Sequence, residues 1–302
     1  MKSSSGFLLL LLLLLLLTVC SCSVARYARG PEDREIAARS GFEGILESVT
    51  YPCSEPDLAV RRMVVYLPKE YYRDSLRRYP VMYLLHGARG NEVTWIDSAQ
   101  VLTRLDSLRA AGKSEDFILV LPNVNNYFGD RDYKNGHAVN AVRAFWLLDG
   151  EAERYFVRDV VVRMDSLYRT VASKSGRAIA GMSSGALQAL YLSAAYPDTF
   201  DCVGLFSPYT YPTFAALNHD DIYGPLWSRL KRQFADPPAV YSVYIGKTDF
   251  FCPHIRLFDA KLTRKGYPHK FVLAEGGHEW YNWTDFYVDF CQDVFRQHCL
   301  PE

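Results

Sequence analysis

A serine between two glycines, placed where a strand pattern gives way to a helix pattern, constrains this chain more than any other feature. Residues 181–185 read Gly-Met-Ser-Ser-Gly, with a short apolar run at 177–180 and helically spaced apolar residues at 186–195. A serine on such a strand-to-helix turn is held out of the sheet with its hydroxyl exposed. The helix behind it offers free N–H groups to a developing negative charge. The pattern predicts a nucleophile at Ser183; the alternative is a small-residue turn that matches by chance.

A nucleophilic serine needs a base, and with this turn the chain order is serine, then acid, then histidine. His278 fits that order, because it follows the apolar run at residues 271–274 in the sequence Glu-Gly-Gly-His. Its loop leaves the carboxyl end of a predicted strand, where the catalytic groups of α/β proteins lie. We therefore expect His278 to be the base. The other histidines are His86, His137, His219, His254, His269 and His298.

The acid that orients the base should follow the strand before it. Residues 240–246 form a β-branched and aromatic run typical of a buried strand, and Asp249 comes shortly after it. Asp249 would accept the Nδ1–H of His278 and stabilise the imidazolium as it forms. The nearest rivals are Asp236, which precedes the strand, and Asp259, which lies on the following helix pattern. Neither of them lies at the carboxyl end.

An oxyanion needs two donors, and the backbone supplies both. One is the N–H of Ser184, the residue after the nucleophile. The other comes from a His-Gly turn that ends the continuous apolar run at residues 81–85. The glycine lets the backbone turn, so that the N–H of Ala88 can point at the ester oxygen. His86 itself is expected to pack under the loop.

Five motifs occur in an order that resembles the esterase D-like group of the α/β-hydrolases. This group of putative esterases includes feruloyl and acetyl-xylan esterases, S-formylglutathione hydrolases, enterochelin esterases and mycolyltransferases. The resemblance covers about Gly41 to Gln297. The motifs are Tyr83-Leu84-Leu85-His86-Gly87, Leu121-Pro122-Asn123, Ile179-Ala180-Gly181-Met182-Ser183-Ser184-Gly185-Ala186, Gly246-Lys247-Thr248-Asp249 and Gly276-Gly277-His278-Glu279-Trp280.

The resemblance implies a nucleophile at Ser183, an acid at Asp249 and a base at His278, with oxyanion amides at Ala88 and Ser184. It also implies the α/β-hydrolase fold, with a mostly parallel central sheet and helices on both faces. Two positions depart from the pattern of the group. Ser184 stands where the group usually has methionine, but only its backbone acts, and Ala186 replaces a second glycine at little steric cost.

Composition is that of an enzyme with one sizeable core. The chain has 302 residues, of which 49% are hydrophobic, and 34 basic residues balance 34 acidic ones. Zero net charge gives no support for a nucleic-acid partner. No Cys/His ligand spacing appears, so neither a metal nor a cofactor is expected. Expected strands lie near 43–50, 61–68, 80–86, 117–122, 177–182, 201–206, 239–246 and 269–274, and expected helices near 98–111, 154–171, 184–196, 252–265 and 284–297.

The N-terminus reads as a targeting segment. Lys2 precedes an unbroken apolar run at residues 7–17, too short to span a bilayer but right for a signal peptide. The run ends in Ser21-Cys22, which resembles a bacterial lipoprotein processing site with Cys22 as the lipidated residue. We thus expect a signal peptide at 1–21, a polar tether at 22–40 and a catalytic domain at 41–302. The protein would be a cell-envelope lipoprotein, on the periplasmic or surface face, whose lipid is its sole membrane contact; ordinary cleavage and secretion is the alternative.

Aromatic residues are the candidates for substrate contact. Tyr211 and Trp227 lie in an insertion at 209–238 expected to cap the cleft, and Trp280 follows the base. Flat aromatic faces can stack on a sugar ring or a phenolic acyl group. The alternative is that they pack the core. Five cysteines follow the tether, and of these Cys252 and Cys291 could meet as a disulfide; the full set is Cys53, Cys202, Cys252, Cys291 and Cys299.

These features predict a serine esterase that cleaves carboxylic esters through an acyl-serine intermediate. The resemblance makes acetyl or feruloyl esters of polysaccharides the expected substrates, so the partner would be a small-molecule or carbohydrate ester. Acyl transfer and a siderophore ester substrate stay open. So does a binding protein without catalysis, which an intact set of serine, acid and histidine disfavours.

Overall fold

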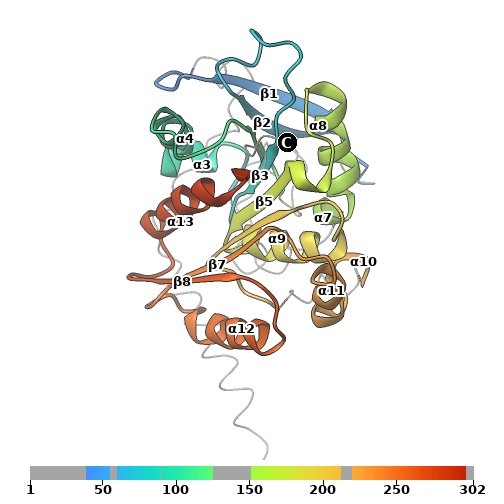
Figure 1. The fold of residues 1–302 in the computed structure, drawn as a ribbon, viewed down its shortest axis with the longest axis vertical. Helices are drawn as coiled ribbons and strands as arrows, with labels where there is room; N and C mark the ends of the chain where they lie inside the picture. Colours follow the sequence, from blue (N-terminus) through green and yellow to red (C-terminus); the bar gives the residue numbers. More distant parts are fainter. Residues whose placement is uncertain (1–38, 55–59, 89, 125–150, 212–219, 297–302) are drawn as a thin grey trace, which may run out of the picture.

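The computed structural model describes residues 39–54, 60–88, 90–124, 151–211 and 220–296 (Figure 1). These residues form one eight-stranded sheet of order β1-β2-β4-β3-β5-β6-β7-β8. The strands are β1 (Ile45–Pro52), β2 (Val60–Leu67), β3 (Val81–Leu85), β4 (Ile118–Pro122), β5 (Arg177–Met182), β6 (Cys202–Phe206), β7 (Val240–Gly246) and β8 (Lys270–Ala274). β1 pairs with β2 and β2 with β4 antiparallel, and the remaining pairs are parallel. The expected α/β-hydrolase sheet is confirmed.

The helices lie on both faces of this sheet, and Figure 1 shows α3, α4 and α13 together on one side. The α-helices are α3 (Thr94–Ala99), α4 (Val101–Ala110), α7 (Glu151–Phe156), α8 (Val162–Leu167), α9 (Ser184–Ala195), α10 (Asp220–Tyr223), α11 (Leu226–Gln233), α12 (Cys252–Arg264) and α13 (Trp280–Asp293). A π-helical turn, η1 (Val157–Val161), joins α7 to α8, and a 3₁₀ turn, η2 (Lys174–Gly176), precedes β5.

Alternation along the central strands divides the apolar interior into two cores. In β3, Val81, Tyr83 and Leu85 face the core under α7, α9 and α12, whereas Met82 and Leu84 face the core under α3, α4 and α13. Successive strand side chains point to opposite faces, so a strand covered on both sides must be apolar throughout. All five β3 residues are buried accordingly.

The Cys252–Cys291 disulfide that the sequence left possible does not form. Both are free thiols, as is Cys202, and Cys299 lies outside the described residues. Cys252 belongs to the core under α12 and Cys291 to the core under α13. The sheet lies between these two cores, so the two sulfur atoms cannot meet.

Candidate active site

The carboxyl ends of four parallel strands carry the residues singled out in the sequence. Ser183 follows β5 directly, and Ala88 lies in the loop after β3. Asp249 follows β7, and His278 lies in the loop between β8 and α13. In a parallel sheet these ends share one edge, which is where α/β proteins place their ligands.

Ser183 occupies the sharp turn between β5 and α9. Its backbone has φ 53° and ψ −117°, a conformation that costs strain in any residue with a Cβ. Its N–H donates to the carbonyl of Phe206 at 2.9 Å, which fixes the turn to the end of β6. Room for the turn depends on Gly185, since a Cβ there would meet the carbonyl oxygens of Leu85 and His86.

Three side chains form a continuous hydrogen-bond chain at this turn. The Ser183 hydroxyl lies 2.9 Å from Nε2 of His278, and Nδ1 of His278 lies 2.8 Å from Oδ2 of Asp249. The Asp249 side chain is fully buried, and its other oxygen accepts the N–H of Phe251 at 2.9 Å. A neutral ring that donates from Nδ1 leaves Nε2 as an acceptor for the serine proton.

The rival carboxylates have other partners. Asp236 pairs with Lys174 on the exposed surface. Asp259 lies on α12, and its carboxylate is 2.9 Å from Nε2 of His269. Thus Asp249 is the one candidate acid that the structure brings to His278.

A set of backbone contacts holds the loop that carries His278. Gly276 has φ 81°, and a Cβ there would collide with the hydroxyl of Tyr281. The carbonyl of Gly277 accepts from Nδ2 of Asn282 at 2.8 Å, and Asn282 is 2% exposed. The loop is therefore fixed by the first turn of α13, a contact that the sequence did not indicate.

His86 braces the loop expected to supply an oxyanion donor. Its Nδ1 lies 2.8 Å from the carbonyl of Gly87, and its Nε2 lies 3.0 Å from the N–H of Val124. Burial lowers the pKa of His86 to about 4, so the ring is neutral and serves one donor and one acceptor role. This agrees with the expected structural role. The adjacent Ala88 is exposed, and Gly87 packs on Met182, just before the nucleophile.

Aromatic rings surround His278. Phe250 lies 4.6 Å from the imidazole between ring centroids, Trp283 4.9 Å and Phe251 5.5 Å. Phe250 and Phe251 are not among the residues predicted from the sequence, although two aromatic residues directly after Asp249 are a usable signal. Phe250 is 43% exposed, so part of this aromatic surface remains accessible to a ligand.

The three expected substrate contacts have different surroundings. Tyr211 is 70% exposed and lies 4.6 Å from the ring of His254, which follows Phe251 on α12. Trp280 is half-buried between Trp95 and Trp283. Trp227 packs on Phe258 and carries the ammonium group of Lys261 over its ring, so its described contacts are packing contacts.

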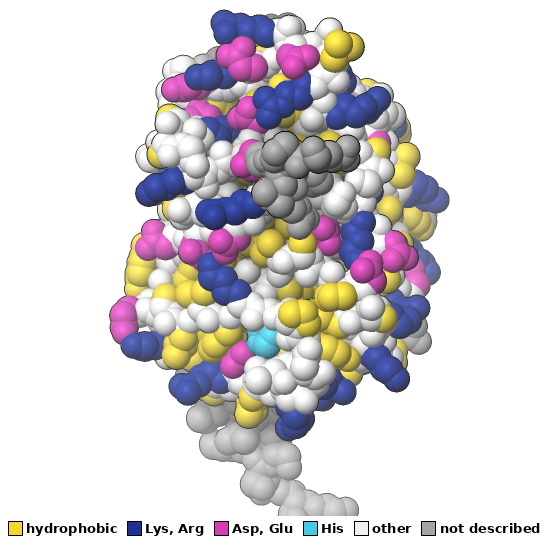
Figure 2. All heavy atoms as spheres, in the orientation of Figure 1, with side chains coloured by type: hydrophobic (Ala, Val, Ile, Leu, Met, Phe, Trp, Pro, Cys, Tyr) yellow, Lys and Arg dark blue, Asp and Glu magenta, His cyan; other side chains and the backbone are white. Residues whose placement is uncertain are grey.

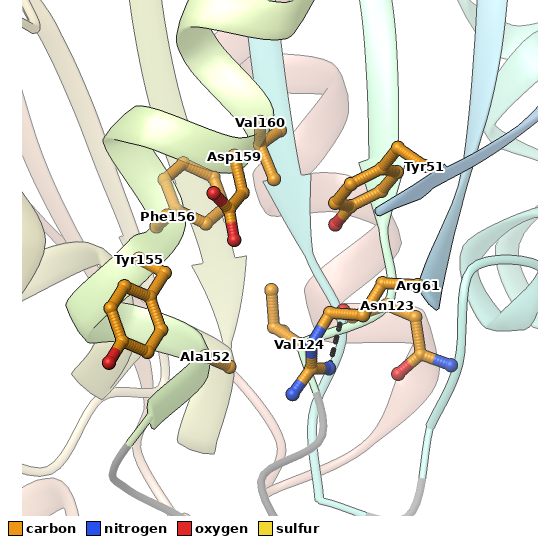
Figure 3. Close-up of a pocket in the computed structure, with 9 residues that line it drawn as sticks. All are labelled: Tyr51, Arg61, Asn123, Val124, Ala152, Tyr155, Phe156, Asp159 and Val160. Carbon is orange, nitrogen blue, oxygen red and sulfur yellow. Dashed lines mark hydrogen bonds between the residues drawn. The ribbon is translucent and has the colours of Figure 1, made fainter. Parts of the chain in front are cut away.

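A small pocket lies beside this edge of the sheet, between η1 and the first two strands (Figure 3). Arg61 and Asn123 approach from one wall and Tyr155, Phe156 and Asp159 from the other. Its lining includes Val124, whose N–H binds His86, but contains no member of the Ser183–His278–Asp249 chain.

Charge on the face drawn in Figure 2 is mixed, with basic and acidic side chains interspersed around apolar ones.

Within the described ranges no group of three or more His, Cys, Asp or Glu side chains could hold a metal ion. In the same part of the chain no helix is long and apolar enough to cross a membrane. Cys22 and the N-terminal segment lie outside the described residues.

A family profile described as "Putative esterase" matches residues 59–249. The chain belongs to this esterase family. The match spans β2 through Asp249, and so includes the Ser183 turn.

One curated protein is similar to this chain in sequence, and two solved structures are similar to it in fold. The endo-1,4-beta-xylanase/feruloyl esterase of Xylanibacter ruminicola is 27% identical over 258 residues, which cover 84% of this chain but 32% of that protein. A ferulic acid esterase from Anaeromyces mucronatus has a similar fold, with a TM-score of 0.63, 21% identity and coverage of 89% of this chain and 97% of that one. An S-formylglutathione hydrolase from Staphylococcus aureus gives a TM-score of 0.60, 15% identity and coverage of 84% and 97%.

Proposed function

We propose that this protein is a serine carboxylic-ester hydrolase that acts through an acyl-serine intermediate. One observation carries the proposal: the Ser183 hydroxyl, the imidazole of His278 and the buried carboxylate of Asp249 lie in one hydrogen-bond chain, with distances of 2.9 and 2.8 Å. A serine, a base and an orienting acid in this order are the requirements for an activated nucleophile. Membership of the esterase family supports the same reaction class.

The reaction begins with attack of Ser183 Oγ on the ester carbonyl while His278 Nε2 takes the hydroxyl proton. The buried carboxylate of Asp249 stabilises the imidazolium that results. The N–H groups of Ser184 and Ala88 hold the oxyanion, Ser184 from the unpaired first turn of α9. His278 then gives the proton to the leaving alcohol. Water attacks the acyl-serine in the same way and releases the acid.

The substrates that we propose are feruloyl esters, with a carbohydrate as the alcohol. The similar protein from Xylanibacter ruminicola is an endo-1,4-beta-xylanase/feruloyl esterase, and the one from Anaeromyces mucronatus is a ferulic acid esterase. In this chain the accessible aromatic surface of Phe250 and Tyr211 gives a phenolic acyl group flat faces to contact. An acetyl group is too small to use that surface.

A panel of methyl ferulate and p-nitrophenyl acetate tests the function and its substrate class. The wild type should hydrolyse both, and Ser183→Ala should hydrolyse neither. Phe250→Ala and Tyr211→Ala should each lower kcat/KM for methyl ferulate, with a loss of ~1–2 kcal/mol in transition-state binding. The loss for p-nitrophenyl acetate should be smaller. Turnover by Ser183→Ala near that of the wild type would refute the mechanism. Equal losses on both esters would refute the feruloyl assignment alone.

We propose further that the protein is exported and held at the cell envelope by a lipid on Cys22. The support is the apolar run at residues 7–17 followed by Ser21-Cys22. Two acyl chains on one cysteine give stable membrane attachment. Cys22→Ala should move the protein from the membrane fraction to the soluble fraction. A wild type that is fully soluble, with an unmodified N-terminus by mass spectrometry, would contradict the anchor.

A further inference from the structure

Three tryptophans connect the oxyanion loop to the catalytic base. Trp95 and Trp280 lie 5.5 Å apart between ring centroids with their planes at 88°. Trp280 and Trp283 lie 5.2 Å apart at 85°, and Trp283 lies 4.9 Å from His278 at 88°. Each contact is edge-to-face, a preferred geometry for aromatic rings because the positive edge of one meets the negative face of the other.

The first tryptophan is fixed to the oxyanion side. Trp95 lies on α3, is 1% exposed, and donates its indole N–H to the carbonyl of Leu85 at 3.0 Å. Leu85 ends β3, and the loop with Gly87 and Ala88 follows it. The same carbonyl faces Gly185 so closely that a Cβ there would lie 2.7 Å away. Trp95 is thus held rigidly to the strand that carries the oxyanion loop.

The last tryptophan has a different kind of support. Trp283 is 7% exposed, and its buried indole nitrogen has no hydrogen-bond partner among the described residues. Ring packing against Trp280 and His278 therefore orients it. Trp280 lies between the other two tryptophans and is half-buried. Its ring contacts both Trp95 and Trp283.

We propose that Trp280 is a positioning residue. It holds the imidazole of His278 in place relative to the oxyanion loop, the loop with Gly87 and Ala88. The proposal rests on the esterase mechanism above and goes beyond it. The reacting ester needs groups from two elements that are far apart in the sequence. The loop after β3 supplies an oxyanion donor, and the loop before α13 supplies the base. Directional contacts through Trp280 join them, and small misplacement of reacting groups is costly in rate. In this role Trp280 acts through His278 rather than by stacking on substrate.

The test compares Trp280→Leu and Trp280→Phe in the full chain. Leucine removes the ring, whereas phenylalanine keeps an edge-to-face partner for both neighbours. Trp280→Leu should lower kcat about tenfold to a hundredfold on p-nitrophenyl acetate and methyl ferulate alike, with KM little changed. Trp280→Phe should recover most of that loss.

Trp227 supplies a matched control. It also has a ring neighbour, Phe258 at 5.5 Å, but its contacts are on α11 and α12 away from His278. Trp227→Leu should lower the thermal unfolding temperature and leave kcat near wild type. If Trp280→Leu gives this same pattern, Trp280 is only structural and the proposal is wrong. A higher KM for methyl ferulate alone, with p-nitrophenyl acetate unaffected, would assign it to substrate stacking and also overturn the proposal.

A substrate-free measurement separates this proposal from the esterase function. The low-field proton NMR signal of the His278 Nδ1–H donated to Asp249 reports the position of the base directly. Its broadening or loss in Trp280→Leu, with retention in Trp227→Leu, would support positioning even if the wild type hydrolysed neither ester. An unchanged signal in Trp280→Leu would overturn it, whereas failure of wild-type hydrolysis would count against the proposed function alone.

Discussion

At the scale of single residues, two non-glycine residues with positive φ follow neighbouring strands at the sheet edge that carries the candidate site. Ser183 has φ 53° and Ser207 has φ 51°, and they end the neighbouring strands β5 and β6. Ser207 is fully buried, and its hydroxyl has no hydrogen-bond partner among the described atoms. The glycine pattern around Ser183 predicted the first strained turn. Nothing comparable marks Ser207, because its conformation depends on a hydrogen bond from its N–H to Tyr244 on β7.

Strain at Ser183 can be measured with two inactive variants. Ser183→Gly should be more stable than Ser183→Ala by ~1 kcal/mol, because glycine adopts positive φ without a Cβ clash. Chemical denaturation at one pH gives the two unfolding free energies. Since neither variant has the hydroxyl, both should lack esterase activity. Equal stabilities would mean that the turn is not strained.

Burial of His86 gives a pH dependence with a defined direction. Its folded pKa of about 4 lies below the ordinary value of 6.5, so the unfolded chain takes up the proton first as the pH falls. The stabilisation is complete above pH 6.5 and is lost between there and about pH 4, by about 1.4 kcal/mol per pH unit. His86→Gln should reduce this slope in urea unfolding measured across the window. An identical slope in both proteins would contradict a buried neutral ring.

At the scale of elements, patterns located the strands better than the helix boundaries. The eight expected strands all occur, each within about two residues of its predicted bounds. Buried apolar runs define them. The last helix was expected from residue 284 but begins at Trp280, because the segment after His278 read as a loop. The expected helix at 98–111 corresponds to α4 and to the last two residues of α3, and Gln100, with a φ of 50°, separates these two helices. The π turn at Val157–Val161 interrupts the expected helix at 154–171.

The early start of α13 predicts a role for Asn282. Its amide holds the carbonyl of Gly277, next to His278. Asn282→Ala should lower kcat about tenfold and cost about 1 kcal/mol of stability, since it leaves the part-buried carbonyl of Gly277 without its donor. Gln292→Ala is the control and should retain kcat, because the amide of Gln292 lies farther along α13 and donates to the carbonyl of Val288 at 3.2 Å. Full activity in Asn282→Ala would mean that the loop keeps its position unaided.

At the scale of the whole molecule, the sequence predicted the contacts that follow from chain order and a shared edge of the sheet, and it missed contacts between side chains of elements that no such rule relates. The order serine, acid, histidine and the strand after which each falls indicated a common edge, and the structure brings Ser183, Asp249 and His278 into hydrogen-bond contact there. The contact of Trp95 with Trp280 joins distant segments, and no local pattern records it. The Cys252–Cys291 pair is absent for a related reason. The order of elements along the chain does not say on which face of the sheet a side chain lies, and these two lie on opposite faces.

Division of the interior by the sheet leads to a prediction about the thiols. Cys202 and Cys291 are fully buried in the core under α13, and burial raises the pKa of each to about 12. The thiolate is the reactive form, so iodoacetamide at pH 8 should leave both unmodified in the native protein and label both after unfolding. Mass spectrometry of digests made without reductant reads the labels and any disulfide together. Rapid native labelling of Cys291, or a peptide linking it to Cys252, would show that the two cores are not separated as the structure has them.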